Sequence, residues 1–199
     1  ARKLASQGAD IAFTYKSSQQ SALELEKELQ AMGVRARAYA SDAADYAQAE
    51  KLIEQILADF GGLEIIVNNA GYVWNSAMHN HSDEQWQAML EMHATAPFRL
   101  LRAYYPWLKA KVAEEAATGQ VVCRKVVNIS SISGTEGAAT QIAYSAGKAA
   151  VVGMGFKGKF YRLVSAKHST STPTPSSSTS TRSATPRRSA SDTRRSMGS

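Results

Sequence analysis

The chain has 199 residues, of which 44% are hydrophobic, so it is long and apolar enough for one ordinary domain with a core. Its formal net charge is +6, but residues 169–199 hold five Arg and one Asp (net +4), which leaves only +2 on the first 168 residues. The sequence has neither a stretch of about 18 apolar residues nor a charged leader before an apolar run, so we expect no membrane span and no signal peptide.

The single cysteine, Cys123, excludes an internal disulfide and the usual four-thiolate metal site, which fits a reducing, cytoplasmic setting. It stands in the apolar run QVVCRKVV. In such a run we expect a small side chain that is buried or partly buried, and we expect no nucleophile.

Residues 169–199 differ in composition from the rest of the chain. They contain no Val, Ile, Leu or aromatic residue, and 18 of the 31 positions are Ser or Thr (11 and 7). Burial cannot offset the ordering entropy of such a segment, so we predict a partial domain over 1–157 and a disordered, low-complexity tail over 158–199. We expect a solvated tail and no nucleic-acid partner. The alternative is a basic arm modified by kinases at RRSAS and TRRS.

Short apolar runs alternate with longer amphipathic ones through the first 158 residues, which is typical of β/α units on a parallel sheet. The chain opens on a helix end, ARKLASQGA, with Gly8 as its expected stop. We predict strands at 10–15, 34–40, 63–71 and 124–131, and helices at 17–33, 43–62, 82–117 and from about residue 141. This order predicts an α/β fold with a doubly wound, Rossmann-like parallel sheet.

The longest predicted helix, over 82–117, has clear local signals. Ser82 is its expected N-cap, and Gln85 three residues later completes a capping-box pattern. Pro97 and Pro106 lie inside the segment and lack the backbone N–H that a helix interior needs. We therefore expect a kink or a break at one or both prolines.

Three polar motifs follow strands or begin a helix: NNAG at 68–71, NISS at 128–131 and YSAGK at 144–148. The carboxyl ends of parallel strands share one edge of the sheet, so the first two motifs should converge there. Tyr144 and Lys148, four apart on a helix, share one face. A lysine ammonium beside a phenol stabilises the phenolate, and a serine hydroxyl nearby can hold a substrate oxygen. The set suits proton transfer during interconversion of a carbonyl and an alcohol.

Each motif alone has a simpler interpretation, such as a half-buried Tyr beside a solvated Lys or an Asn-rich turn. In combination they resemble the short-chain dehydrogenase/reductase family, in its 3-oxoacyl-carrier-protein reductase-like branch, over residues 1–154. The family's catalytic Ser precedes its Tyr by thirteen residues, as Ser131 precedes Tyr144 here, whereas Ser130 and Ser133 do not fit. The resemblance also makes Asp42 the residue that contacts adenine. It gives Asn68, Asn69, Ala70 and Gly71 the place of the family's NNAG signature beside the cofactor.

His93 occupies the place where the family usually carries an Asn of the proton relay. A histidine can donate and accept protons near neutrality, so one interpretation is that His93 also passes protons. The other is that His93 only replaces the structural hydrogen bonds of the Asn. His79 and His81, in AMHNHSDE, have no metal-like partners in the sequence, and we expect exposed loop residues.

The end of the strand at 10–15 indicates the cofactor. NAD-preferring relatives place an Asp there, whereas this chain has Lys16 followed by Ser17 and Ser18, which suit a 2′-phosphate and favour NADP. The resemblance then implies hydride transfer from NADPH to a carbonyl carbon, with Tyr144 as the acid. Ser131 would hold the oxygen, and Lys148 would tune Tyr144 and contact the nicotinamide ribose.

Two departures from the family bear on activity. No glycine-rich loop of the family pattern is present, and the strand before it would lie between the strands at 10–15 and 63–67, so we expect an interrupted sheet. After Met154 the composition shifts abruptly, which suggests a change of reading frame, a mis-spliced exon or a mis-called gene end near residue 155. The leading hypothesis is an NADP-dependent carbonyl reductase that acts on a small molecule such as a 3-oxoacyl thioester, a sugar or a small ketone. We expect the parent enzyme to form homo-oligomers and to have no membrane partner. The alternative is a non-catalytic scaffold.

Overall fold

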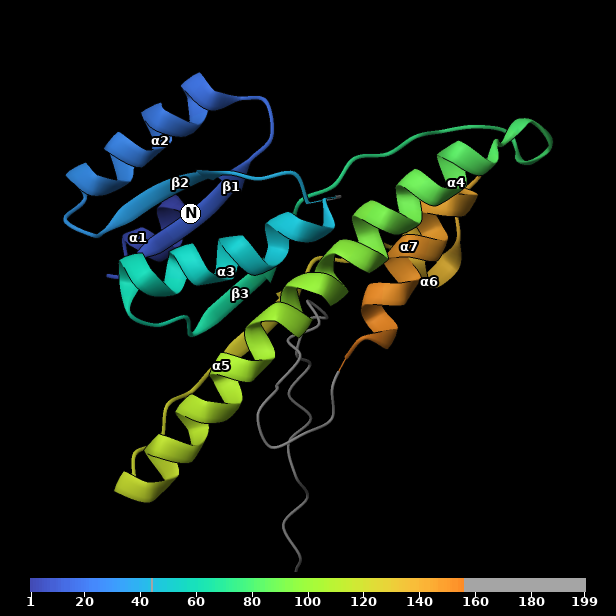
Figure 1. Cartoon of the computed structure of the whole chain (residues 1–199). Coiled ribbons are helices and arrows are strands. Elements are labelled where there is room, and N and C mark those ends of the chain that lie inside the picture. The colour runs from blue at the N-terminus through green and yellow to red at the C-terminus, as the bar shows by residue number, and fades with distance from the viewer. Residues whose placement is uncertain (44, 156–199) are drawn as a thin grey trace, which may run out of the picture. The chain divides into compact units, whose positions relative to one another are not determined.

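Two pairs of parallel strands form the framework of the computed structural model, which describes residues 1–43 and 45–155 (Figure 1). β1 (Ile11–Tyr15) pairs with β2 (Ala36–Ala40), and β3 (Ile65–Asn68) pairs with β4 (Lys125–Asn128). The strand predictions are confirmed, although the observed strands are shorter at their ends. The predicted tail over 158–199 and the break after Met154 concern a region that lies almost wholly outside the described residues.

Helices alternate with these strands along the chain, as the sequence predicts for an α/β fold. The α-helices that the structure describes are α1 (Arg2–Ala5), α2 (Gln19–Ala31), α3 (Tyr46–Phe60), α4 (Asp83–Leu90), α5 (Ala96–Thr118), α6 (Ser133–Glu136) and α7 (Ile142–Gly153). A 3₁₀ turn, η1 (Met78–Asn80), precedes α4, and a π-helical turn, η2 (Glu91–Thr95), joins α4 to α5. The α-helix α6 was not predicted, because its four residues lie in a stretch that reads as a Gly-rich loop.

The first strand pair is covered on both faces, which confirms the doubly wound arrangement. Ile11 and its register partner Ala36 pack with Leu29 of α2. The next residue of β1, Ala12, lies against the cluster that contains Leu52 of α3. Successive side chains of a strand point to opposite faces, so α2 and α3 must cover opposite sides of this pair.

The sheet is interrupted where the sequence predicts. Among the described strands, β1 pairs with β2 and β3 pairs with β4, and no pairing joins β1 to β3. Helix α3 spans the interruption from one face, because its Ile53 packs with Ile66 and Val126 of the second pair while its Ile56 packs with Tyr39 of the first.

The predicted long helix is continuous, but a π-helical turn interrupts its α-helical pattern just before the first of its two prolines. Ser82 caps α4 in a capping box with Gln85, as expected. The π-helical turn ends just before Pro97, the second residue of α5, whereas Pro106 lies inside α5. The ring of a helical proline clashes with the carbonyl four residues earlier, and one wider π-type turn relieves that clash.

The prediction for Cys123 was wrong, because its side chain is exposed. It stands in the extended segment after Gly119, before β4 begins at Lys125, so its apolar neighbours Val121 and Val122 are exposed too. An apolar run predicts burial only when a strand or helix places it against a core, and this run precedes its strand.

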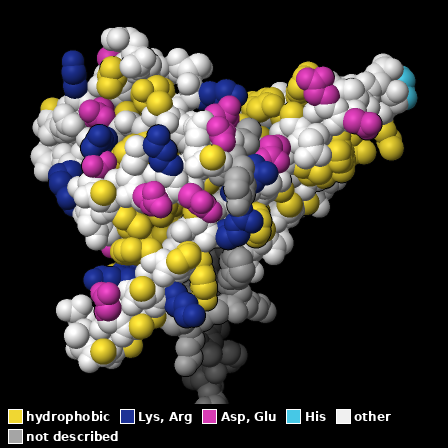
Figure 2. Space-filling view, viewed as in Figure 1, with side chains coloured by type: hydrophobic (Ala, Val, Ile, Leu, Met, Phe, Trp, Pro, Cys, Tyr) yellow, Lys and Arg dark blue, Asp and Glu magenta, His cyan; other side chains and the backbone are white. Residues whose placement is uncertain are grey.

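On the face shown in Figure 2, Lys and Arg side chains alternate with Asp and Glu, while apolar side chains gather along the arm that carries α4 and α5. Trp86, Phe98 and Tyr105 on these two helices are 39%, 49% and 53% exposed. These large side chains leave apolar area on α4 and α5 open to a partner surface. Within the described part of the chain, no helix is long and apolar enough to cross a membrane.

Candidate active site

The ends of β3 and β4 bring the NNAG and NISS motifs together, as predicted. Asn68 and Asn128 are register partners, and the Asn68 Nδ2 donates to the Asn128 Oδ1 over 2.7 Å. The backbone N–H of Ile129 donates to the Asn68 carbonyl oxygen over 3.0 Å. Both motifs therefore lie at the carboxyl edge of this strand pair, where open parallel sheets bind their ligands.

Helix α7 places Lys148 beside this edge. The Lys148 side chain is buried, and its Nζ donates to the Ile129 carbonyl oxygen over 2.7 Å. Its burial lowers the pKa of Lys148 from the ordinary value. The same Nζ lies 5.7 Å from the centre of the Tyr144 ring, so the predicted pair of Tyr and Lys is assembled on one face of α7.

The three serines of this region have different hydrogen bonds. The Ser130 Oγ donates to the Lys148 carbonyl oxygen (2.8 Å), and the buried Ser133 donates from its Oγ to Gln141 Oε1 (3.0 Å). Ser131 only accepts in its bond with the Ser133 backbone N–H (3.2 Å), which uses an oxygen lone pair and not the hydroxyl proton. The Ser130 and Ser133 hydroxyls thus tie their segments to α7. The bond from the Ser133 N–H to Ser131 leaves the Ser131 hydroxyl proton unused.

Gly134 lets α6 approach the backbone of α7 closely. A Cβ at Gly134 would lie 2.7 Å from the Lys148 carbonyl carbon and 2.9 Å from the Ala149 nitrogen, both of them backbone atoms that cannot swing away. A glycine is therefore required at this contact, and it holds the segment that follows Ser131 against the helix that carries Tyr144.

His93 lies at the centre of the site, in the π-helical turn η2. Its side chain is 2% exposed, and its Nε2 donates to the Tyr72 carbonyl oxygen over 2.7 Å. Its ring meets the Tyr144 ring edge-on, with centroids 4.9 Å apart. A Cβ at Gly71 would lie 2.3 Å from the His93 Cε1, and one at Gly147 would lie 2.8 Å from the His93 Cβ. His93 is thus enclosed by a glycine from each of two motifs.

These contacts favour the structural interpretation of His93 over the proton relay. A carbonyl oxygen only accepts, so Nε2 carries a proton in this arrangement. The other nitrogen, Nδ1, is buried and has no hydrogen-bond partner among the residues that the structure describes. Burial is the largest cause that lowers the pKa of His93, and Lys148 adds to it, so the ring resists taking a second proton.

We expect His93 to make the protein less stable in acid. Its pKa is lowered in the folded state, so below about pH 6.5 the unfolded chain binds a proton that the folded chain refuses. The free energy of unfolding should therefore fall as the pH drops from about 7 to 5, by at most about 1.4 kcal/mol per pH unit. In urea unfolding, the native chain should show this loss of stability and His93→Asn should not. His79→Asn, at an exposed position, is the control and should behave like the native chain. Equal losses of stability in all three proteins would contradict the assignment of this acid sensitivity to His93.

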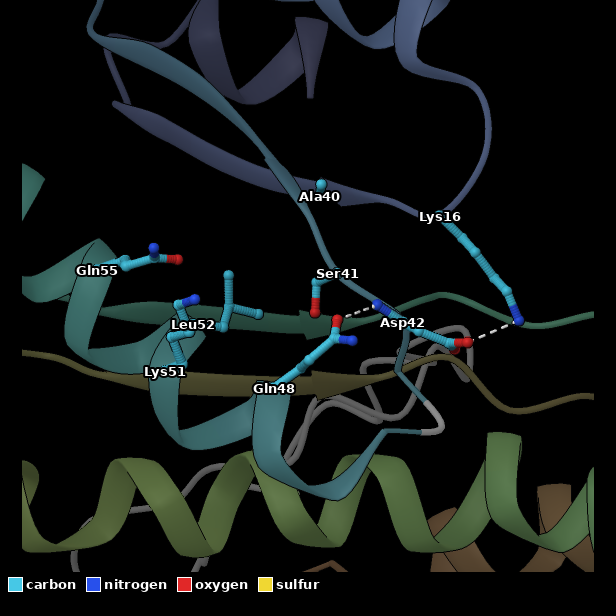
Figure 3. Close-up of a pocket in the computed structure, with 8 residues that line it drawn as sticks. All are labelled: Lys16, Ala40, Ser41, Asp42, Gln48, Lys51, Leu52 and Gln55. Carbon is cyan, nitrogen blue, oxygen red and sulfur yellow. Dashed lines mark hydrogen bonds and ion pairs between the residues drawn. The ribbon is translucent and has the colours of Figure 1, made fainter.

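The predicted cofactor residues Lys16 and Asp42 meet at the carboxyl ends of β1 and β2 (Figure 3). The Lys16 Nζ lies 2.7 Å from the Asp42 Oδ2, and the Asp42 backbone N–H donates to Gln48 Oε1 over 2.6 Å. The ion pair raises the pKa of Lys16. These residues border an open hollow of about 460 Å³ that is also lined by Ser41 and Lys51.

The structure thus places the predicted residues in two groups. Around β3, β4 and α7 lie Asn68, Asn69, Ala70, Gly71, His93, Ser131, Tyr144 and Lys148, and at β1 and β2 lie Lys16 and Asp42. The donors of the two groups fit the two ends of a phosphorylated dinucleotide. At one end the Lys16 ammonium and the Ser41 hydroxyl lie beside the hollow, and at the other end lies the buried Lys148 ammonium. His79 is exposed as predicted, His81 is partly buried, and no metal-binding cluster occurs among the described residues.

Sequence reasoning missed Gln48, Tyr72 and Gly147. Gln48 and Tyr72 act through a single side-chain amide and a single backbone carbonyl, which have no pattern of their own. Gly147 had a signal, because a glycine inside a helix costs about 1 kcal/mol relative to Ala and needs a packing reason. That reason is the His93 side chain.

Comparison with known proteins adds an independent result. The family described as short chain dehydrogenase matches residues 1–157. The NADP-dependent mannitol dehydrogenase of Alternaria alternata is 35% identical over 104 residues, which are 52% of this chain and 39% of that protein. The 3-oxoacyl-[acyl-carrier-protein] reductase FabG of Staphylococcus aureus is 26% identical over 157 residues, 77% of this chain and 58% of its own length.

A solved structure is also similar to this chain. The crystal structure of a blue fluorescent protein from a metagenomic library, in complex with NADPH, superposes with a TM-score of 0.65 at 33% identity and covers 77% of this chain and 58% of that one. This chain thus spans between about two fifths and three fifths of the length of these proteins. Since the family match extends over most of its length, the chain belongs to the short-chain dehydrogenase/reductase family.

Proposed function

We propose that this site reduces a carbonyl to an alcohol with NADPH as the hydride donor. The observation that carries the proposal is the buried Lys148, which is fixed by the Ile129 carbonyl at the end of β4 and lies on the face of α7 that presents Tyr144. A cation held in a fixed, low-dielectric position beside a phenol favours proton transfer at that phenol.

Each residue has a role in this reaction. NADPH supplies the hydride for the carbonyl carbon when it is bound. Tyr144 gives its phenolic proton to the carbonyl oxygen, so that the products are the alcohol and NADP⁺. Ser131 donates a hydrogen bond to the same oxygen, keeps its own proton and orients the carbonyl, and Lys148 supports the phenolate that forms. His93 holds the Tyr72 carbonyl and the edge of the Tyr144 ring.

The cofactor would be held at both groups of residues. Lys16 and Asp42 would bind the adenosine end, and Asn68 to Gly71, Tyr144 and Lys148 would bind the nicotinamide end. Two similar proteins, the NADP-dependent mannitol dehydrogenase and the blue fluorescent protein in complex with NADPH, support NADP for this chain. The substrate classes that we propose are 3-oxoacyl thioesters, sugars or polyols, and small ketones.

We expect the chain to bind NADPH about ten-fold to a hundred-fold more tightly than NADH, because a hydrogen bond between charged groups contributes about 1.5–3 kcal/mol. Lys16→Ala should remove most of this difference, since Lys16 is the cation at the end of β1. Cofactor fluorescence titrations of both proteins would measure it. Equal affinity for the two cofactors in the native chain would contradict the assignment of NADP.

Saturable binding of NADPH to the 199-residue chain is the test of the proposal as a whole. Binding that saturates below millimolar cofactor supports the reductase. A lack of binding at millimolar cofactor contradicts it and favours a scaffold, for which the exposed Trp86, Phe98 and Tyr105 on α4 and α5 would supply an association surface between two copies. Light scattering of the native chain and of Phe98→Glu would then detect that association.

A further inference from the structure

The ion pair between Lys16 and Asp42 has a fixed member and a free one. The Gln48 side chain accepts from the Asp42 backbone N–H (2.6 Å) and donates to Asp45 Oδ2 (2.8 Å), and Asp45 is the N-cap of α3. Asp42 is therefore tied to the start of a helix through its backbone. The Lys16 side chain is 68% exposed, against 29% for Asp42, and it has four rotatable bonds. Lys16 is the partner that is free to move.

A phosphate cannot join this pair without disturbing it. An anion oxygen bound to an ammonium lies about 2.8 Å from the nitrogen. Because Asp42 Oδ2 already lies 2.7 Å from the Lys16 Nζ, the anion and the carboxylate would be within about 5.5 Å of each other. Two like charges at that distance repel, and the repulsion grows with the double charge of a phosphate. The Asp42 carboxylate therefore weakens the binding of a phosphate at the Lys16 ammonium.

We propose that Asp42 determines how strongly this site prefers a 2′-phosphate, because its carboxylate competes with that phosphate for Lys16. The inference rests on the proposed use of NADP. It adds a residue, Asp42, that opposes the effect of Lys16 on that preference. Asp42 reduces the preference that Lys16 creates, and removal of the Asp42 charge increases it. The role is distinct from a contact with adenine, which would affect phosphorylated and unphosphorylated adenosine equally.

The experiment compares adenosine 2′-monophosphate with adenosine as probes of the full chain, by ¹H–¹⁵N NMR titration. The measured quantity is the Kd for adenosine divided by the Kd for adenosine 2′-monophosphate, in which any adenine contact cancels. Asp42→Asn should raise this ratio about two- to five-fold, the range expected for loss of a partly exposed ion pair. Lys16→Ala should bring the ratio close to one. Glu28→Gln breaks an exposed pair with Arg2 and should leave the ratio unchanged.

The outcomes separate this inference from the proposed function. A raised ratio in Asp42→Asn, with an unchanged spectrum elsewhere, supports the competition. An unchanged or lower ratio in Asp42→Asn, while the native chain still prefers the 2′-phosphate, overturns the competition and leaves the use of NADP intact. A ratio near one in both the native chain and Asp42→Asn overturns both.

Discussion

Replacement of Tyr144 with Phe is expected to slow carbonyl reduction by about a hundred-fold to ten-thousand-fold, the usual contribution of a positioned general acid. The change removes only the phenolic O–H and keeps the ring, so the edge contact with His93 and the packing around Lys148 remain. NADPH oxidation at saturating substrate measures the effect, and the free energy of unfolding should stay within about 0.5 kcal/mol of the native value.

Tyr105→Phe is the matched control for this substitution. Tyr105 is 53% exposed on α5 and lies outside the proposed site, so loss of its hydroxyl should leave turnover unchanged. If Tyr144→Phe and Tyr105→Phe had equal turnover, Tyr144 would not be the acid, and the proposed mechanism would be wrong at its main step.

The second large effect is expected from Gly147→Ala. A new Cβ at this position would lie 2.8 Å from the His93 Cβ and 3.1 Å from the Met89 carbonyl oxygen, neither of which is the far end of a flexible side chain. Overpacking of this kind costs about 1–3 kcal/mol, which exceeds the gain of about 1 kcal/mol that Ala brings to a helix interior. We expect a net loss of up to about 2 kcal/mol in urea unfolding, and slower turnover because His93 and Tyr144 are displaced.

Gly153→Ala on the same helix gives the opposite sign. Outside its own helix backbone and chain neighbours, no atom of the described residues lies within 4 Å of a Cβ built at Gly153, so the substitution should be neutral or stabilise the protein by up to about 1 kcal/mol. If Gly147→Ala were as stable as Gly153→Ala, the close packing of α7 on His93 would be wrong.

Periodicity and motif spacing were sufficient to predict the order of the strands and of the longer helices. The strand ends at Asn68 and Asn128 were predicted to converge, and they are register partners, because the side-chain period of a strand and the shared edge of parallel strands leave few alternatives. The interruption between β1 and β3 was also predicted, since the resemblance left one strand position without a matching segment.

The details that depend on three-dimensional packing could not be predicted. The π-helical turn at Glu91–Thr95 depends on how one wider turn accommodates Pro97, and the sequence indicated only a kink or a break. The Lys16 and Asp42 side chains were each assigned to the cofactor, but their mutual ion pair joins residues from two different strand ends. The enclosure of His93 by Gly71 and Gly147 involves three segments that are distant in the chain, so no local pattern contains it.

The most direct test of the proposed reductase is to follow the hydride itself. The full chain would be given NADPH deuterated at the transferred position together with a 3-oxoacyl thioester, a sugar ketone or a small ketone, and the product alcohol would be analysed by mass spectrometry. We expect deuterium on the carbinol carbon with the native chain and a loss of about a hundred-fold or more with Tyr144→Phe. A native chain that binds NADPH but yields no labelled alcohol from any of these three substrate classes would contradict the proposal.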